Sequence, residues 1–199
     1  DFCLSRGLGD VYKRQTVSWA MEKIQLYNLS FEKYITKELL EHRIKELGER
    51  IALDFQGEEL VLLGVLNGAF VVMADLARAI DLQITCEFIK ISSYAGTSTS
   101  GSVKSILGLS SDLRGKNVLV VEDIVDTGIS MDFLVSELSA HHPKCLAIAT
   151  LLFKKEAFRF NYRLDYVGFE IPNKFVVGYG LDYDGLGRNL PDLYQLSET

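Results

Sequence analysis

Residues 118–130 constrain the fold of this chain more than any other stretch, because they join a buried strand to a helix through a run of acids. They read Val-Leu-Val-Val-Glu-Asp-Ile-Val-Asp-Thr-Gly-Ile-Ser. The first four residues are apolar and mostly β-branched, which is typical of a buried strand. Apolar residues then recur at helical spacing over 129–138. A strand that turns through Thr-Gly-Ile-Ser into a helix is suited to hold an anion, because free amides, hydroxyls and the positive helix end converge there.

The carboxylates in this stretch narrow the ligand further. Glu122 and Asp123 end the strand and Asp126 opens the turn. A simpler interpretation is an acidic connection in which Asp126 only caps the helix. Three acids so close together repel one another at the end of a buried strand, however, unless a cation or a hydroxyl-rich ligand compensates. The residues therefore predict a sugar phosphate, with hydroxyls or a divalent cation beside the carboxylates.

Strands alternate with helical patterns along the rest of the chain. A helix capped by Thr36 is expected over 36–55 and a second helix over 70–80, because apolar residues recur there at helical spacing. Short apolar runs predict strands, which we expect at 60–66, 84–92, 103–109, 145–153, 166–169 and 175–179. This alternation predicts one α/β domain with a parallel sheet covered on both faces. Ligands of such sheets bind at the carboxyl ends of the strands.

Composition excludes several other classes of protein. A net charge of −6 over 199 residues opposes nucleic-acid binding as the main function, which needs a basic face. No apolar run approaches the roughly 20 residues of a membrane span. Three cysteines are too few and too scattered for a disulfide framework or a zinc site, which favours a reducing compartment, the cytoplasm. Residues 1–20 lack an initiator Met and a periodic pattern, so we expect a non-native or disordered leader before a single domain over 21–199.

The run from Glu122 to Gly128 resembles the phosphoribosyl-pyrophosphate (PRPP) signature of the type I phosphoribosyltransferase family, and most closely its hypoxanthine-guanine branch. The fold that this resemblance implies is a central, mostly parallel sheet of about five strands flanked by helices, with a small hood subdomain from the terminal segments. It also implies that Asp126 stands near the purine N7 as the catalytic proton acceptor or donor. The residues that would bind PRPP and its 5′-phosphate are Glu122, Asp123, Asp126, Thr127, Gly128, Ile129 and Ser130.

A second segment that matches the family is Leu66-Asn67-Gly68, directly after the first predicted strand of the sheet. By itself it is a tight turn that uses glycine. By resemblance it is the pyrophosphate-binding loop, with a cis peptide between Leu66 and Asn67. Many relatives carry Lys where this chain has Asn67. The other pyrophosphate contacts implied by the resemblance are Ser93 and Tyr94, in a mobile lid over 92–101, and Arg188.

The base site is implied by segments nearer the C-terminus. Lys154 follows a predicted strand, where a lysine is ordinarily just solvated; by resemblance it donates to O6 of a 6-oxopurine. Residues 171–184 read by themselves as a strand between polar turns. By resemblance they complete the purine site with Lys174, Phe175, Val176 and Asp182, where Phe175 stacks on the base and the backbone of Val176 binds its edge. The implied ligands of Mg²⁺ are Glu122, Asp123 and Asp182.

Two motifs resemble other sites but lack the required residues. Gly96 and Gly101 have the spacing of a P-loop, yet Ser102 and Val103 follow where Lys and Ser or Thr are needed. Residues 182–193 begin like a calcium loop, but Leu193 occupies the position of the bidentate acid.

The activity implied by the resemblance is purine salvage. PRPP and hypoxanthine or guanine would give IMP or GMP and pyrophosphate, by transfer of the phosphoribosyl group to N9 of the base. We expect a cytoplasmic homodimer or homotetramer with no nucleic-acid or membrane partner. A xanthine-preferring transferase and a PRPP-binding RNA regulator of pyrimidine genes are the alternatives. Lys154 disfavours adenine, because its cation favours an oxo group over an amino group, but it does not separate the three oxopurines.

Overall fold

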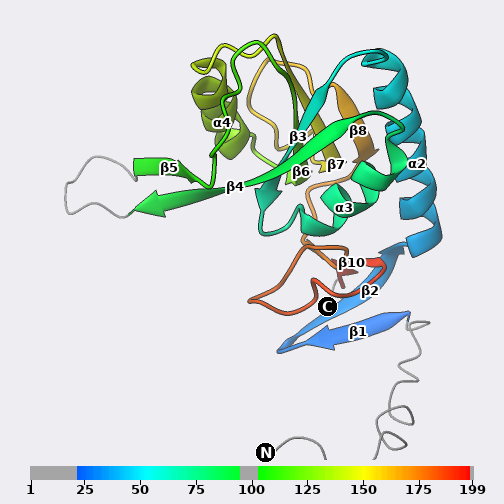
Figure 1. Cartoon of the computed structure of the whole chain (residues 1–199). Coiled ribbons are helices and arrows are strands. Elements are labelled where there is room, and N and C mark those ends of the chain that lie inside the picture. The colour runs from blue at the N-terminus through cyan, green and yellow to red at the C-terminus, as the bar shows by residue number, and fades with distance from the viewer. Residues whose placement is uncertain (1–21, 95–102, 198–199) are drawn as a thin grey trace, which may run out of the picture.

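The computed structural model describes residues 22–94 and 103–197, as a sheet with helices on both faces and a second, smaller sheet beside it (Figure 1). The side chains of residues 92–94 and 103–107 also lie outside the description. The leader expected over 1–20 falls entirely outside the described residues. No helix in the described ranges is both long and apolar enough to cross a membrane.

The larger sheet has the predicted parallel arrangement. Its strand order is β5-β4-β3-β6-β7-β8, in which β4, β3, β6, β7 and β8 are parallel and β5 is an antiparallel edge strand. The α/β fold with five parallel strands is thereby confirmed. The strands span Leu60–Leu66 (β3), Ile84–Tyr94 (β4), Val103–Leu107 (β5), Asn117–Val125 (β6), Cys145–Phe153 (β7) and Tyr166–Glu170 (β8).

Helices cover both faces of this sheet because successive residues of each buried strand point to opposite sides. On one face, Leu62 and Leu119 belong to the same core as α2 (Lys37–Asp54) and α3 (Phe70–Ala79). On the other face, Leu63 and Val120 belong to a second core with α4 (Ile129–Ser139). The strands are therefore apolar without interruption, as expected for a parallel sheet buried on both faces. Figure 1 shows α2 and α3 on one side and α4 on the other.

The smaller sheet forms the hood, and the sequence patterns did not predict most of it. Its order is β1-β2-β10-β9, all antiparallel, from β1 (Lys23–Leu26), β2 (Leu29–Ile35), β9 (Val176–Val177) and β10 (Leu193–Leu196). It packs around a small third core of Phe31, Val177 and Tyr194. Because β2 pairs with β10 from the other end of the chain, the hood is built from both terminal segments, as the resemblance implied.

Several predicted strand boundaries are wrong: the strand expected over 103–109 ends at Leu107, and β6 continues past Glu122 and Asp123 to Val125. Two further differences have a local reason. The strand expected over 175–179 is only Val176–Val177, because Gly178 and Tyr179 have φ angles of +103° and +46°, which end the extended backbone. β4 runs two residues further than expected, to Tyr94, because it pairs with β5 through Val103. Neither change moves the carboxyl ends of β3, β6 and β7, where the predicted site residues lie.

Candidate active site

The acids at the end of β6 are held where their charge is unfavourable. Glu122 Oε2 is shielded from solvent and has no hydrogen-bond partner. Burial, together with the neighbouring Asp123, raises the pKa of Glu122 well above its usual range. Burial also raises the pKa of Asp123 to about 6, although the backbone amide of Ile124 donates to its carboxylate at 2.9 Å. Shifts of this kind mark groups that a cation or a set of ligand hydroxyls would stabilise as anions.

The loop after β3 lies against these acids. The Leu66–Asn67 peptide is cis, which confirms the expectation from the resemblance. A Cβ atom on Gly68 would lie 1.5 Å from Oδ2 of Asp123, so the two segments are in direct contact. Only glycine fits at this position with the carboxylate where it is. The Asn67 side chain is exposed.

The turn from β6 into α4 has the shape that the sequence predicted for an anion site. Gly128 is the N-cap of α4 and has a φ angle of +82°, which favours glycine. The helix begins at Ile129, so its positive end lies at the turn that contains Thr127 and Gly128. A helix terminus of this kind can hold an anion such as a phosphate.

A segment that the sequence analysis missed holds this turn. The amide of Arg159 donates to the carbonyl of Thr127 at 3.2 Å, and the hydroxyl of Tyr162 donates to the carbonyl of Gly128 at 3.4 Å. A Cβ on Gly128 would come within 2.5 Å of the Phe158 ring. The signal in the sequence was the aromatic run Phe158-Arg-Phe-Asn-Tyr162, which follows Lys154 closely. We refer to the turn over 126–130 as the phosphate turn, after the ligand predicted for it. The aromatic segment links this turn to the end of β7.

Lys154, directly after β7, forms an ion pair with Asp126, directly after β6. The Lys154 Nζ lies 2.8 Å from Asp126 Oδ2, and the Lys154 side chain is 8% exposed against 44% for Asp126. The lysine is therefore not a solvated surface residue. The expected base contact and the expected proton acceptor are brought together, beside the phosphate turn.

The hood supplies the other half of the site. Arg188 pairs with Asp182 at 2.5 Å and donates to the carbonyl of Gly180 at 2.7 Å. A Cβ on Gly180 would lie 2.2 Å from the carbonyl oxygen of Gly68, so this segment rests on the loop after β3. Arg188 lowers and Asp182 raises the pKa of Asp123. The hood residues thus lie within electrostatic reach of the acids of β6.

The aromatic part of the predicted base site is also assembled in the hood. Phe175 is 43% exposed, which leaves a ring face available for stacking. The Tyr183 ring lies edge-on to it at 5.9 Å, and Phe31 lies behind at 6.1 Å. Val176 is buried in β9 and Lys174 is half-buried. Such edge-on packing fixes the orientation of the Phe175 ring.

The remaining predicted contacts are only partly described. Ser93 and Tyr94 are the last two residues of β4, where their backbones pair with Lys104 and Val103. Their side chains and residues 95–101 of the expected lid lie outside the described residues. Among the described residues no group of three or more His, Cys, Asp or Glu side chains is arranged to hold a metal ion. The assignment of Glu122, Asp123 and Asp182 to Mg²⁺ stays a prediction.

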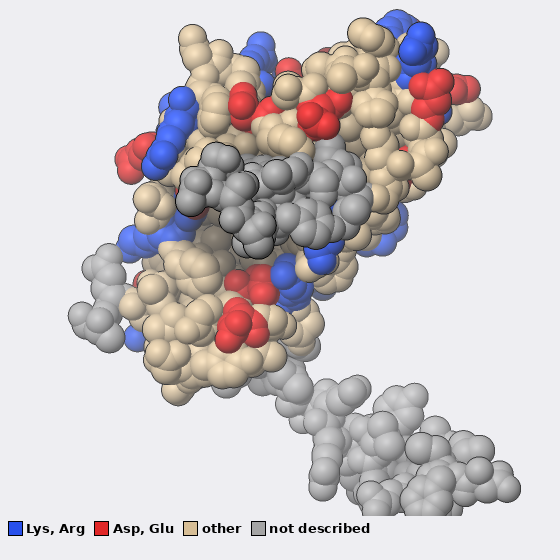
Figure 2. All heavy atoms as spheres, turned by 90° about the vertical axis from the view of Figure 1, so that its left-hand side faces the viewer, with Lys and Arg blue, Asp and Glu red and all other residues tan. Residues whose placement is uncertain are grey.

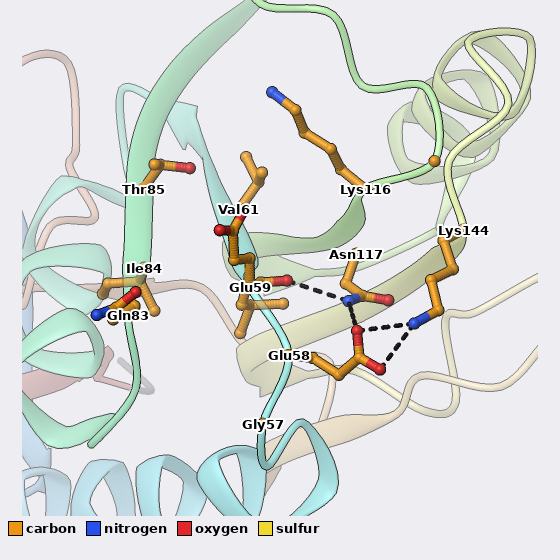
Figure 3. A pocket seen from close by; sticks show the side chains of 12 residues that line it. Gly57, Glu58, Glu59, Val61, Gln83, Ile84, Thr85, Lys116, Asn117 and Lys144 are labelled. Atoms are coloured by element: carbon orange, nitrogen blue, oxygen red, sulfur yellow. Dashed lines mark hydrogen bonds and ion pairs between the residues drawn. The ribbon is translucent and has the colours of Figure 1, made fainter.

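A pocket of about 610 Å³ lies at the opposite, amino-terminal edge of the sheet (Figure 3). Lys144 forms an ion pair with Glu58 at 2.7 Å, and the Asn117 amide donates to the same carboxylate at 3.3 Å. None of the predicted site residues lines this pocket. In open α/β sheets the reacting ligand binds at the carboxyl ends of the strands, so the geometry favours the other edge as the active site.

Comparisons with known proteins show which proteins this chain is similar to. Residues 32–184 match the phosphoribosyl transferase domain family. The chain is 42% identical over 166 residues to a hypoxanthine-guanine phosphoribosyltransferase from Aquifex aeolicus, covering 82% of this chain and 93% of the relative. It is 45% identical over 163 residues to the protein of the same name from Mycobacterium tuberculosis, covering 78% of this chain and 81% of the relative.

Solved structures of proteins with related names are also similar to this chain. A hypoxanthine-guanine phosphoribosyltransferase from Bacillus anthracis superposes with a TM-score of 0.75 at 41% identity, over 84% of this chain and 97% of its own. A hypoxanthine phosphoribosyltransferase from Trypanosoma cruzi superposes with a TM-score of 0.77 at 39% identity, over 83% of this chain and 94% of its own.

Proposed function

The chain belongs to the phosphoribosyltransferase family and is a purine-salvage enzyme of its hypoxanthine-guanine branch; from this premise we propose how its residues carry out the reaction. The 5-phosphoribosyl group of PRPP passes to N9 of hypoxanthine or guanine, giving IMP or GMP and pyrophosphate. The observation that carries the assignment of roles is the Lys154–Asp126 pair at 2.8 Å beside the phosphate turn. It places a hydrogen-bond donor and a carboxylate side by side, which supports the proposal that both face one edge of the base.

Lys154 and Asp126 act on the purine base in this proposal. The ammonium of Lys154 donates to O6, which favours an oxo group over the amino group of adenine. Asp126 accepts or returns the proton at N7, a form of general acid–base catalysis. Phe175 stacks on the ring, and the backbone of Val176 and the side chain of Lys174 bind its edge. The exposed face of Phe175 supports this role.

The turn over 126–130 holds the 5′-phosphate through backbone amides and the hydroxyls of Thr127 and Ser130. Glu122 and Asp123 face the ribose hydroxyls. Charge develops on the ribose as an oxocarbenium ion and on the departing pyrophosphate. The protein therefore needs to hold the two reactants in line and to stabilise both charges. The contact of Gly68 with Asp123 supports this arrangement, because it brings the leaving-group loop to the ribose acids.

The leaving pyrophosphate is held by the backbone of residues 66–68 and by Arg188. Ser93 and Tyr94 close over it and exclude water, which would otherwise capture the ribosyl cation. The ion pair of Arg188 with Asp182 supports this role, because it fixes the guanidinium close to the acids of β6. Asn67 contributes only backbone groups to this loop.

Magnesium is the metal that we infer for this site. Its usual ligands in phosphate chemistry are one or two carboxylates together with phosphate oxygens and water. The unpartnered oxygen of Glu122 and the raised pKa of Asp123 fit such an ion, and Asp182 is the third candidate ligand. When bound, the metal neutralises charge on the pyrophosphate. The chain's own residues orient it and the two substrates.

We further infer a cytoplasmic homodimer or homotetramer that needs no nucleic-acid or membrane partner. Among the described residues on the face shown in Figure 2, acidic and basic side chains are interspersed. The net charge of −6 also argues against a basic surface. Both observations support a small-molecule enzyme over an RNA regulator, since RNA binding needs a basic patch.

A panel of bases with PRPP and Mg²⁺ tests the proposal. We expect turnover of hypoxanthine and guanine, measured by absorbance, and none of adenine or uracil. Turnover of xanthine in preference to both would support the xanthine alternative. No turnover of any base, together with salt-sensitive RNA binding, would overturn the enzymatic assignment.

A further inference from the structure

Tyr179 and Asp75 join the hood to helix α3, and neither belongs to the residues assigned to the reaction above. The buried hydroxyl of Tyr179 donates a hydrogen bond to the Asp75 carboxylate, whose other oxygen pairs with Arg78. Asp75 lies on α3, the helix that begins just after Gly68. The bond therefore ties the C-terminal part of the hood to the helix that follows the pyrophosphate loop.

The backbone next to this bond is pressed against that loop. Tyr179 has a φ angle of +46°, a conformation that residues other than glycine seldom adopt. Gly180 follows with a φ of +103°, and a Cβ there would lie 2.2 Å from the carbonyl oxygen of Gly68. Such a backbone conformation persists only where the surroundings hold it. Two hydrogen bonds hold the backbone of Tyr179 here. Its hydroxyl donates to Asp75, and its amide donates to the carbonyl of Leu190 at 2.8 Å.

The same turn determines where Arg188 lies. The amide of Gly180 donates to the carbonyl of Arg188 at 3.0 Å, and the Arg188 guanidinium donates back to the carbonyl of Gly180 at 2.7 Å. The guanidinium also pairs with Asp182. A shift of Gly180 would therefore move Arg188 relative to both Gly68 and Asp182. The chain of contacts runs from Asp75 through Tyr179 and Gly180 to Arg188.

We propose that Tyr179 and Asp75 are positioning residues of the leaving-group site, holding the turn at Gly180 so that Arg188 and the loop over 66–68 face pyrophosphate together. This inference rests on the proposed function, because it takes Arg188 and this loop as the pyrophosphate contacts. The two residues act on the leaving-group side of the site only. Loss of either residue should weaken the binding of pyrophosphate and of PRPP. The binding of the base and of the 5′-phosphate should change very little.

Tyr179→Phe tests this with a small change, since it removes only the hydroxyl. Tyr166→Phe is a matched control: Tyr166 is also buried and donates to a helical carboxylate, Asp54, at 2.8 Å, but it lies on β8. We expect Tyr179→Phe to raise the Kd for magnesium pyrophosphate and the KM for PRPP about tenfold, as for the loss of a hydrogen bond to a charged group. The Kd for IMP and the KM for the base should change less than about twofold.

Several outcomes decide between this role and a merely structural one. Equal losses of pyrophosphate and IMP binding, or the same pattern in Tyr166→Phe, would overturn the proposal. If Tyr179→Phe does not fold, Asp75→Ala, which removes the acceptor of the same hydrogen bond, gives the second measurement, with the same selective loss expected. Wild-type protein that binds pyrophosphate but turns over no base would contradict the proposed function alone, because the pyrophosphate titration still tests the positioning role.

Discussion

The side-chain nitrogen of Lys154 lies 2.8 Å from a carboxylate oxygen of Asp126, and the lysine is almost fully buried while the aspartate is half-exposed. A base that enters between them would receive a hydrogen bond from the lysine and exchange a proton with the aspartate. Each partner also compensates the charge of the other while the site is empty of base, because an isolated charge at a buried position is costly. The two residues can nevertheless be tested separately.

Lys154→Ala should raise the KM for hypoxanthine by about tenfold or more, because the O6 atom of the base would lose its hydrogen-bond donor. The KM for PRPP should rise much less. Lys155→Ala is the control, because Lys155 is the next residue, is exposed, and pairs with Glu170 at 3.3 Å. Steady-state kinetics with each substrate varied in turn measure the split. Equal changes in the two KM values would count against a contact of Lys154 with O6.

Asp126→Asn should lower kcat by at least about tenfold, because it removes the group that exchanges the N7 proton but keeps the size of the side chain. The variant should still bind IMP, since the amides of the phosphate turn remain. Asp81→Asn, at an exposed position after α3, gives the background effect of losing one carboxylate. An unchanged kcat in Asp126→Asn would refute the proton-transfer role.

Asp123 should make the unliganded protein less stable as pH rises. Burial raises its folded pKa to about 6 from an ordinary 3.8, so the folded state binds the proton more tightly than the unfolded state. Its contribution to stability is therefore fully present below pH 3.8 and is lost as pH rises through about 6. The loss is on the order of 1–3 kcal/mol. Asp123→Asn should be more stable than wild type at pH 8, and the difference should shrink towards pH 4.

Thermal unfolding of both proteins across this pH range, without ligands, measures the difference. Magnesium pyrophosphate should reduce it at pH 8, because a bound cation favours the carboxylate over the protonated form. A wild-type Tm that rises relative to Asp123→Asn between pH 5 and pH 8 would contradict the raised pKa.

The parts of the fold that local patterns specify were predictable, and those that distant pairing creates were not. The strand at Leu60–Leu66 and the helix after Thr36 follow from continuous apolar residues and from a capped helical repeat. The hood strand Leu29–Ile35 pairs with its neighbour β1 and also with β10 at the other end of the chain, and this second pairing has no local signal. Its Lys33 side chain pairs with buried Asp192 at 3.2 Å.

In the candidate site, too, local patterns could be predicted and contacts between distant segments could not. The signature at Glu122–Asp126 could be found because acids after a buried strand are unusual in any fold. The contact of Gly68 with Asp123 and the bond from Tyr179 to Asp75 could not, because each joins segments that only the folded chain brings together. Sequence resemblance therefore supplied the proposed reacting residues, and the structure added contacts between segments that are distant in the sequence.

The contact of Gly68 with Asp123 leads to a prediction that a double-mutant cycle can decide. In Gly68→Ala the new Cβ would lie 1.5 Å from Oδ2 of Asp123, so the carboxylate must rotate away from the amide of Ile124. Because the obstacle is a side-chain end, the Tm should fall only slightly, while the KM for PRPP rises about tenfold or more through the displaced carboxylate. In an Asp123→Ala background the same glycine change should have little further effect, since the atoms that clash are gone. Gly68 is not among the glycines with a positive φ, so the contact of the new Cβ, and not strain of the backbone, would cause the effect. Additive effects of Gly68→Ala and Asp123→Ala would show that the loop acts on PRPP independently of this carboxylate.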